Sequence, residues 1–205
     1  MGHLTLPVFT FWDGPQRPPY IDLCLDAMRR YAPSIQVLDE STVGEWIDVP
    51  SRFDDVSSLA ARTDIYRMLL LREHGGVWLD ADTVLLRNID WLLALLDKHE
   101  SIDTGHGNAV LAARPSAAMV HRWIARQAAT TATDWCAFGI GCYVQAAHTL
   151  PLDYAPVWMM PAPLTVTKDT RMVQLTNHQL SADIWWSTAP ATTLRLVEPF
   201  RGALA

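Results

Sequence analysis

Two aspartates, Asp80 and Asp82, directly follow the short apolar run Val77-Trp78-Leu79, and their type and spacing indicate chemistry. Alternate side chains of an extended strand share a face, so both carboxylates are expected to point the same way, about 7 Å apart. Two carboxylates placed in this way can hold one hard divalent cation, directly or through water. Aspartates after a strand also form turns, so the pair alone has a structural interpretation as well.

The residues before this run predict a helix that brings further charge to the same place. Ser58 is a suitable N-cap, apolar residues recur after it at helical spacing, and Gly75 is a suitable helix end. Asp64 and Arg67 are three residues apart and therefore share a face of this helix. Such a pair is commonly a solvated ion pair, but its combination with the following G-G-V-W-L-D-A-D is far more specific than either part.

This combined pattern, D-x-x-R at 64–67 and G-G-V-W-L-D-A-D at 75–82, resembles the signature of bacterial glycosyltransferases of the sugar-binding D-x-D type. That group includes the capsular polysaccharide synthesis proteins and is distantly related to the glucosyltransferase domains of large clostridial toxins. The resemblance extends over residues 7–90, through F-T-F-W-D-G at 9–14 and the segment 37–50. It implies an α/β fold of the GT-A type, a donor linked to uridine or guanosine diphosphate, and a Mn²⁺ or Mg²⁺ ion.

The resemblance implies catalytic roles for Asp82, Asp80 and Arg67. Asp82 would hold the metal ion, and Asp80 would orient it through water or hold the ribose. Arg67 would pair with phosphate or, equally, lock Asp64 in place. His178, in a C-terminal segment similar to one that supplies a further ligand in relatives, is the third predicted metal ligand. A metal ion held there would act as a Lewis acid and stabilise the charge that develops on the leaving diphosphate.

The residues predicted to contact the substrate come from several segments of the chain. They are Trp12, Asp39, Asp64, Arg67, Gly76, Asp80, Asn108, Ser181 and Trp185. An indole offers a large flat face, so Trp12 is a candidate for stacking on the nucleobase, and the toxin relatives carry a base-stacking Trp at the matching position. Its alternative role is core packing. Asp39 is a candidate acceptor for a ribose or base group, or a turn former. Asn108 would line the sugar pocket, and Ser181 and Trp185 are candidate lid residues.

The N-terminal segments predict a sheet that presents these residues along one edge. Residues 6–12 form an apolar run typical of a parallel strand covered on both faces, and Pro18-Pro19 opens a helix over 20–31. The next strand is expected over 35–38. A strand, a helix and a strand in this order imply a parallel pair with a right-handed crossover. The predicted fold is therefore a GT-A-like α/β domain with a mostly parallel central sheet flanked by helices.

The later segments continue this alternation of strands and helices. The sequence predicts an extended segment over 83–86, a helix from Asp90 to about residue 98 and a strand over 109–113. A helix capped by Ser116 is expected to reach about residue 129, and a second one to cover 140–149.

Ligands of parallel sheets bind beyond the carboxyl ends of the strands. We therefore expect Trp12, Asp39 and the Asp80/Asp82 pair, which follow three different strands, to surround one crevice.

Composition and charge exclude several classes of protein. The 205 residues allow a single domain, with a nucleotide-sugar half at about 1–100 and an acceptor or lid half at about 101–205. A net charge of −6 argues against a nucleic-acid partner. The three cysteines lack metal-binding or disulfide spacing, and no apolar run approaches the ~20 residues of a transmembrane helix. We expect a cytoplasmic protein, compatible with peripheral association with a membrane or a partner subunit.

The predicted function is that of a metal-dependent glycosyltransferase of the hexosyltransferase class. It would transfer a sugar from a nucleotide-diphosphate donor to a hydroxyl of a glycan or small molecule, and the resemblance to the toxin group favours retention of configuration. One alternative is a nucleotide-sugar hydrolase that uses the same site with water as the acceptor. Another is a catalytically silent carbohydrate-binding protein, against which the intact Asp80/Asp82 pair speaks. A structural module whose D-x-D only forms a turn would have no nucleotide affinity.

Overall fold

The fold is seen in a computed structural model, which describes residues 6–14, 17–104, 107–132, 134, 136–150 and 170–174. Three of the predicted site residues, His178, Ser181 and Trp185, lie outside the described residues. Their roles stay predictions.

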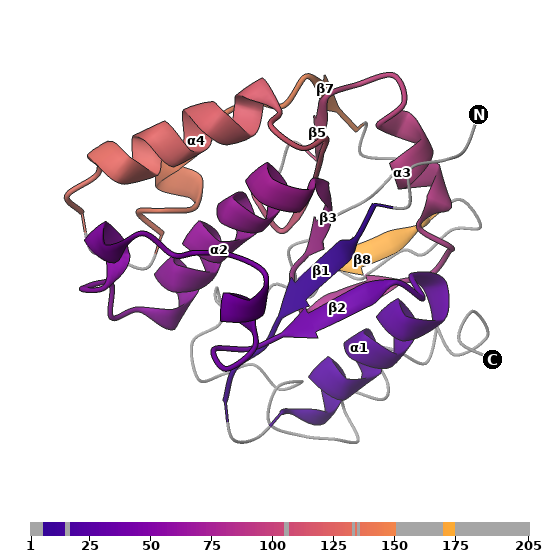
Figure 1. The fold of residues 1–205 in the computed structure, drawn as a ribbon. Helices are drawn as coiled ribbons and strands as arrows, with labels where there is room; N and C mark the ends of the chain where they lie inside the picture. Colours follow the sequence, from indigo (N-terminus) through magenta and orange to yellow (C-terminus); the bar gives the residue numbers. More distant parts are fainter. Residues whose placement is uncertain are drawn as a thin grey trace.

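A six-stranded mixed sheet forms the centre of the fold (Figure 1). In spatial order its strands are β2 (Ile35–Leu38), β1 (Val8–Phe11), β3 (Gly76–Leu79), β6 (Val110–Ala113), β5 (Ser101–Asp103) and β7 (His148–Thr149). Strand β1 is parallel to β2 and β3, and β5 is parallel to β7, whereas β6 is antiparallel to both β3 and β5. The predicted α/β class with a mostly parallel central sheet is confirmed.

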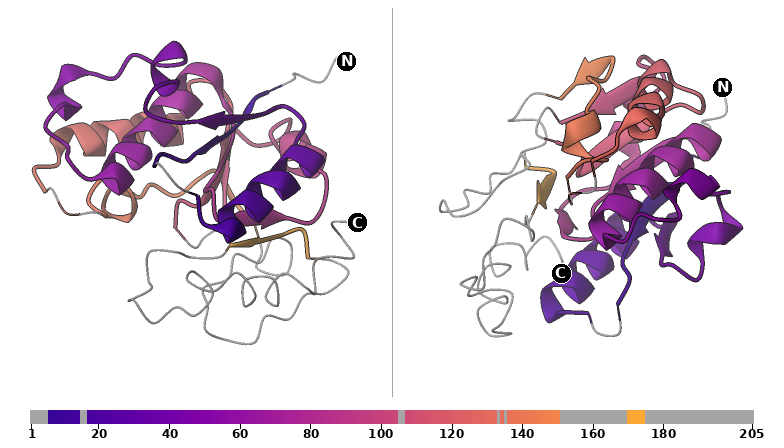
Figure 2. Two further views of the ribbon diagram at one scale, coloured as in Figure 1. Left: turned by 90° about the horizontal axis from the view of Figure 1, so that it is seen from below. Right: turned by 90° about the vertical axis from the view of Figure 1, so that its left-hand side faces the viewer.

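Helices cover both faces of this sheet, as Figures 1 and 2 show from three directions. Helices α2 (Leu59–His74) and α4 (Ala118–Ala129) pack on one face. Helices α1 (Pro19–Tyr31) and α3 (Asp90–Leu95) pack on the other, together with a two-stranded ribbon of β4 (Thr83–Leu85) and β8 (Met172–Gln174). None of the helices in the described part of the chain is long and apolar enough to cross a membrane.

Strands β1 and β3 bury every side chain because each of their faces meets a hydrophobic core. Along β3, Trp78 belongs to the core under α2 and α4, whereas Val77 and Leu79 belong to the core under α1. Phe9 and Val8 of β1 divide in the same way. Side chains alternate between the faces of a strand, so a near-continuous apolar run is what a sheet covered on both sides requires.

The predicted helix before β3 is confirmed at both ends. The Ser58 hydroxyl accepts a hydrogen bond from the backbone N–H of Ala61, 3.4 Å away. Gly75 ends the helix with φ of 64°, a left-handed conformation that favours glycine. Gly76 has φ of 98°, and a Cβ at this position would collide with the backbone carbonyl oxygen of Pro7. The two glycines therefore let the chain reverse from α2 into β3 close against the start of β1.

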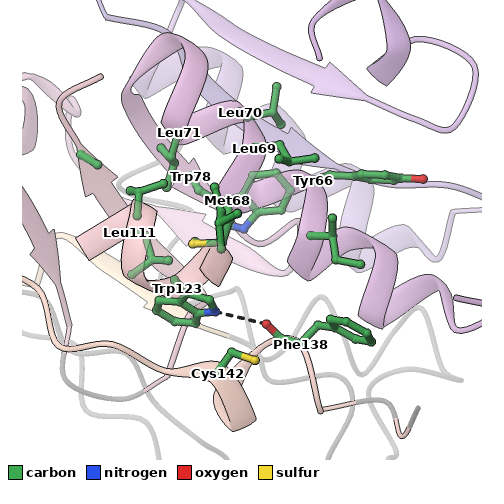
Figure 3. Close-up of a cluster of buried hydrophobic side chains, with 14 of the residues drawn as sticks. Tyr66, Met68, Leu69, Leu70, Leu71, Trp78, Leu111, Trp123, Phe138 and Cys142 are labelled. Atoms are coloured by element: carbon green, nitrogen blue, oxygen red, sulfur yellow. Dashed lines mark hydrogen bonds between the residues drawn. The ribbon is translucent and has the colours of Figure 1, made fainter. Parts of the chain in front are cut away.

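Helix α4 is fixed to α2 through the core that Figure 3 shows. The Trp123 ring is buried there among leucines of α2, and its Nε1 donates a hydrogen bond of 3.1 Å to the backbone oxygen of Phe138. Complete burial of a large apolar side chain stabilises a fold by about 1.5–3 kcal/mol. This contact ties the segment around Phe138 to the same core.

Three predictions about the later segments are wrong in detail. Residues 140–149 are not a helix, because they contain a short 3₁₀ turn (Ile140–Cys142) and then β7, which pairs with β5 at the sheet edge. Ser116 is not the cap of α4; its φ is 60°, and Ala117 occupies the cap position. The helix that starts at Asp90 ends at Leu95, earlier than predicted.

Candidate active site

A pocket of about 330 Å³ opens where β1 and β3 end and α2 begins. Its lining residues are Phe11, Trp12, Asp13, Leu59, Ala60, Thr63, Asp64, Arg67, Asp80, Ala81, Asp82, Asn108, Cys136 and Ile140. Six of the predicted site residues are therefore brought together: Trp12, Asp64, Arg67, Asp80, Asp82 and Asn108. The carboxyl ends of parallel strands are the expected place for a ligand in this class of sheet.

Asp80 is held on the α2 side of the pocket by two donors. Its Oδ1 accepts a hydrogen bond of 2.6 Å from Nη2 of Arg67 and another of 2.7 Å from Nε1 of Trp78. The Arg67 guanidinium also lies 4.9 Å from the centroid of the Trp78 ring. Because Trp78 is completely buried in the core, it anchors both charged groups. The side chain of Asp80 remains 28% exposed at the pocket.

Arg67 joins the two acidic segments of the predicted pattern. It is buried, and besides its contact with Asp80 its Nη1 lies 3.1 Å from Oδ1 of Asp64. A buried arginine needs a carboxylate partner, since its charge would otherwise be uncompensated, and here two carboxylates share that role. The described contacts pair Arg67 with both carboxylates, and its two predicted roles, toward phosphate or toward Asp64, stay predictions.

The acidity of Asp64 is strongly perturbed by its position in the pocket. Burial raises its pKa to about 7, the Arg67 charge and the hydrogen bond from Asn108 oppose the rise, and the Asp80 charge adds to it. The Asn108 Nδ2 donates to Oδ1 of Asp64 over 2.6 Å. A Cβ on Gly139 would collide with Oδ2 of Asp64, so only a glycine allows the loop to lie this close.

Gln127 holds that loop and was missed by sequence reasoning. Its Nε2 donates to the backbone oxygens of Asp64 and Phe138, at 3.0 and 2.8 Å, and so bridges α2 to the segment that carries Gly139. The side chain is buried. A signal for it existed, because Gln127 continues the apolar stripe of Val120 and Ile124 on α4 at helical spacing, and a polar residue there needs buried partners.

Asp82 is held by a different element from Asp80. Its Oδ1 accepts a hydrogen bond from Nε2 of Gln174 in β8. Residues 80–82 form a turn, closed by a bond of 2.9 Å from the Thr83 N–H to the Asp80 carbonyl oxygen, rather than the extended strand end that we expected. Both carboxylates still line the pocket, but the turn directs them to different neighbours.

The surroundings of Asp82 are mainly apolar. Burial, followed by the charge of Asp82, raises the pKa of the Cys24 thiol and of the Tyr20 hydroxyl. Both groups come from α1 and belong to the core on that face of the sheet. Asp82 thus sits at the border between this core and the pocket.

A second pocket of about 400 Å³ adjoins the first and shares Trp12 and Asp13 with it. Gly14, Arg17, Asp22 and Asp39 complete its lining. Arg17 forms an ion pair of 2.9 Å with Asp22. Trp12 thus borders both cavities.

Asp39 lines this second pocket rather than the first, which corrects the single crevice predicted from three strand ends. Its Oδ1 accepts hydrogen bonds from the backbone and hydroxyl groups of Ser41 and Thr42, at 2.7–3.0 Å. These bonds, with the hydroxyls contributing most, lower the pKa of Asp39. The structure therefore shows Asp39 as a turn former, and its chain turns away from the pocket of Asp80.

Gly76, also predicted to contact the substrate, lies at the opposite end of β3 from the two aspartates. It lines neither of the two pockets. The positive φ of this position and the close approach of Pro7 explain why it is a glycine.

The donor groups of the first pocket fit a hard divalent cation. Asp13, Asp64, Asp80 and Asp82 supply carboxylate oxygens, and Mg²⁺ or Mn²⁺ is typically held by one or two carboxylates, with water and substrate phosphates completing the shell. No group of three or more His, Cys, Asp and Glu side chains able to enclose a metal ion occurs among the described residues. A metal ion at Asp80 and Asp82 stays a prediction.

One comparison with known proteins, that with family models, agrees with the predicted resemblance. A family model described as capsular polysaccharide synthesis protein matches residues 3–101. None of the curated proteins matches the chain. Among solved structures, the chain is similar to one described as PaToxG Glycosyltransferase, with a TM-score of 0.40 and 12% sequence identity. That match covers 60% of this chain and 61% of the other, so the chain spans less than two thirds of the length of the structure it matches.

Proposed function

We propose that the chain is a metal-dependent glycosyltransferase, a proposal supported by the match of residues 3–101 to the model of the capsular polysaccharide synthesis protein family. It would transfer a sugar from a nucleotide-diphosphate donor to a hydroxyl group of a glycan or small molecule. The observation that carries this proposal is the pocket at the ends of β1 and β3, in which Asp80 and Asp82 are fixed by separate elements.

The charge of the pocket supports metal dependence. Four aspartates and one arginine are the charged residues among those that line it. The arginine is already bound to Asp64 and Asp80. A diphosphate would be repelled by the remaining negative charge unless a divalent cation came with it. Mn²⁺ or Mg²⁺ at Asp80 and Asp82 would supply the positive charge that stabilises the leaving diphosphate.

The second pocket supports a place for the nucleoside. Trp12 borders both cavities, and its Nε1 is a buried donor without a partner among the described residues. Asp13 and Asp39 there are acceptors suited to ribose hydroxyl groups rather than to phosphate. In this arrangement the base would lie by Trp12, and the diphosphate would reach Asp80 and Asp82.

The donor sugar would then lie against Asp64 and Asn108 in the first pocket. The two side chains are fixed by their mutual hydrogen bond, and Arg67 also contacts Asp64. A carboxylate and an amide fixed in this way can orient sugar hydroxyl groups before the bond to the diphosphate breaks. We propose retention of configuration, which places no requirement for a protein base on the acceptor side.

Thermal unfolding with UDP or GDP and Mn²⁺ tests the proposal. A ligand at 100 times its Kd stabilises the folded state by about 2.7 kcal/mol, so the midpoint should rise with one of the two nucleotides. The rise should need Mn²⁺ and be lost in Asp82→Ala. Asp26→Ala, an exposed aspartate of α1 that pairs with Arg29, is the matched control and should keep the rise. No rise with either nucleotide would contradict the proposal.

Product analysis separates transfer from hydrolysis. With the sugar nucleotide that carries the recognised base, release of free sugar at the same rate with and without an acceptor would favour the hydrolase alternative. Formation of a glycosylated acceptor would support the transferase.

A further inference from the structure

Gln174 is a buried polar residue that enters the site from a distant part of the chain. It ends strand β8, which pairs antiparallel with β4 so that Gln174 lies opposite Thr83. Its side chain is 2% exposed, and Thr83 beside it is completely buried. Burial of an amide is costly unless its donor and acceptor both find partners. The partners it has are therefore informative.

Both ends of the Gln174 amide are bound. Its Nε2 donates to Oδ1 of Asp82, and its Oε1 accepts from the Thr83 hydroxyl. The reversed amide would place Oε1 against the Asp82 carboxylate, which is an acceptor only when ionised. The Thr83 hydroxyl thus completes an arrangement in which the amide N–H must point toward Asp82.

We propose that Gln174 is a positioning residue that orients the Asp82 carboxylate for the metal–diphosphate ligand. The inference rests on the proposed function, because it assigns Gln174 to the same site. Fixing one oxygen of Asp82 fixes the plane of the carboxylate and therefore the direction of its second oxygen. Asp82 lies against the apolar core of α1, so Gln174 also provides a polar contact to a charge at the border of that core.

Hydrogen-bonded partners of a metal-binding carboxylate commonly change metal affinity by about 10- to 100-fold when they are mutated. The experiment measures the Kd of Mn²⁺ in the presence of saturating UDP or GDP, whichever the wild-type chain binds, by titration calorimetry. Gln174→Leu keeps the size of the side chain and removes both contacts. Thr83→Val keeps the shape of the strand residue and removes only the hydroxyl that orients the amide.

We expect the Kd of Mn²⁺ to rise by about 10- to 100-fold in Gln174→Leu and by a smaller factor in Thr83→Val. Thr83→Ser retains the hydroxyl and should restore most of the affinity. Gln36→Leu makes the same change on β2, where Gln36 bonds only the nearby Ser34 carbonyl among the contacts described, and it should match the wild type. Midpoints of unfolding without ligand show whether each variant is folded.

A double-mutant cycle excludes a merely structural role. In an Asp82→Asn background, Gln174→Leu should raise the Kd of Mn²⁺ no further, whereas a general loosening of the fold would add to the effect. Unchanged affinity in both Gln174→Leu and Thr83→Val would overturn the inference and leave the proposed function standing. Failure of the wild-type chain to bind Mn²⁺ with either nucleotide would overturn both.

Discussion

The acidic residues of the pocket differ in what surrounds them, and this difference separates their properties. Asp80 has two hydrogen-bond donors on one oxygen, Asp82 has the amide of Gln174, and Asp64 lies between Arg67 and Asn108. Charged hydrogen bonds stabilise a carboxylate, whereas burial favours its neutral form. For Asp64, burial is the largest influence on the pKa.

The pKa of about 7 predicts how Asp64 affects stability as the pH changes. An unfolded aspartate has a pKa of about 3.9, so between about pH 4 and 7 the folded chain keeps a proton that the unfolded chain has lost. The contribution of Asp64 to the free energy of unfolding is therefore largest at low pH and falls as the pH rises through this window. Asn is an uncharged isostere of the protonated form and does not titrate.

We expect Asp64→Asn to be close to the wild type in stability at pH 5 and to gain on it as the pH rises to 8. Guanidinium unfolding of both chains at several pH values measures the difference. A difference that stays constant over this range would show that Asp64 titrates normally. The same variant should lose donor binding above about pH 7, where the wild-type carboxylate is ionised and offers two acceptor oxygens that the amide cannot replace.

Residue types with a known chemical use could be predicted from the sequence, whereas supporting residues could not. Asp80, Asp82, Asp64 and Arg67 stand in one short pattern, and the structure brings them to one pocket. Gln174 is 92 residues from Asp82, and the pairing that joins them depends on the whole fold. A glutamine in a short segment carries no local signal for such a contact.

At the scale of elements, the sequence predicted those helices and strands whose ends and burial are determined by residues within the element itself. The cap at Ser58, the glycine after His74 and the apolar run of β3 each act within a few residues, and α2 and β3 follow as predicted. Strands β5, β7 and β8 consist of two or three residues that are held by pairing with distant strands. Their short sequences alone cannot be distinguished from those of loops, because the pairing partner determines that they are strands.

The two hydrogen bonds of Gln127 predict that α4 stabilises the segment 136–142, which carries Gly139. Gln127→Met keeps the length of the side chain but removes hydrogen bonds to the backbone oxygens of Asp64 and Phe138. Each such hydrogen bond contributes about 0.5–1.5 kcal/mol, so the loss of both costs about 1–3 kcal/mol. We expect a loss of this size in guanidinium unfolding and faster hydrogen exchange over residues 136–142.

Gln36→Met on the half-buried strand β2 is the control for this change. Gln36 bonds only the nearby Ser34 carbonyl among the contacts described, so the control should lose less stability than Gln127→Met. Equal losses in the two variants, with unchanged exchange in the loop, would show that Gln127 only fills space.

At the scale of the whole molecule, the site is assembled from both halves of the chain. The family match ends at residue 101, yet Asn108, Gln127, Gly139 and Gln174 all contact the acidic residues or hold the segments that do. Strand β6 also lies between β3 and β5, so the sheet itself needs residues beyond the match. The first half supplies the charged groups, and the second half encloses them.

The net charge of −6 and the acidic pocket together predict how the chain depends on metal. Without a divalent cation, a nucleoside diphosphate meets like charge both at long range and at contact. Removal of the cation with EDTA should therefore weaken UDP or GDP binding by much more than tenfold, as measured by calorimetry. Added NaCl should not restore the affinity, because monovalent ions screen exposed charges but do not bridge two carboxylates to a phosphate.

Two observations make this test decisive. Arg67 is already paired with two carboxylates, and Arg17, which lines the second pocket, is paired with Asp22. Among the residues that line the two pockets, neither arginine is therefore available to take the place of the metal ion. Mg²⁺ added after EDTA should restore binding. Equal affinity for the nucleotide in EDTA and in Mn²⁺ would instead show that the diphosphate is held by other cationic groups, and Asp80 and Asp82 would then have to act without a metal.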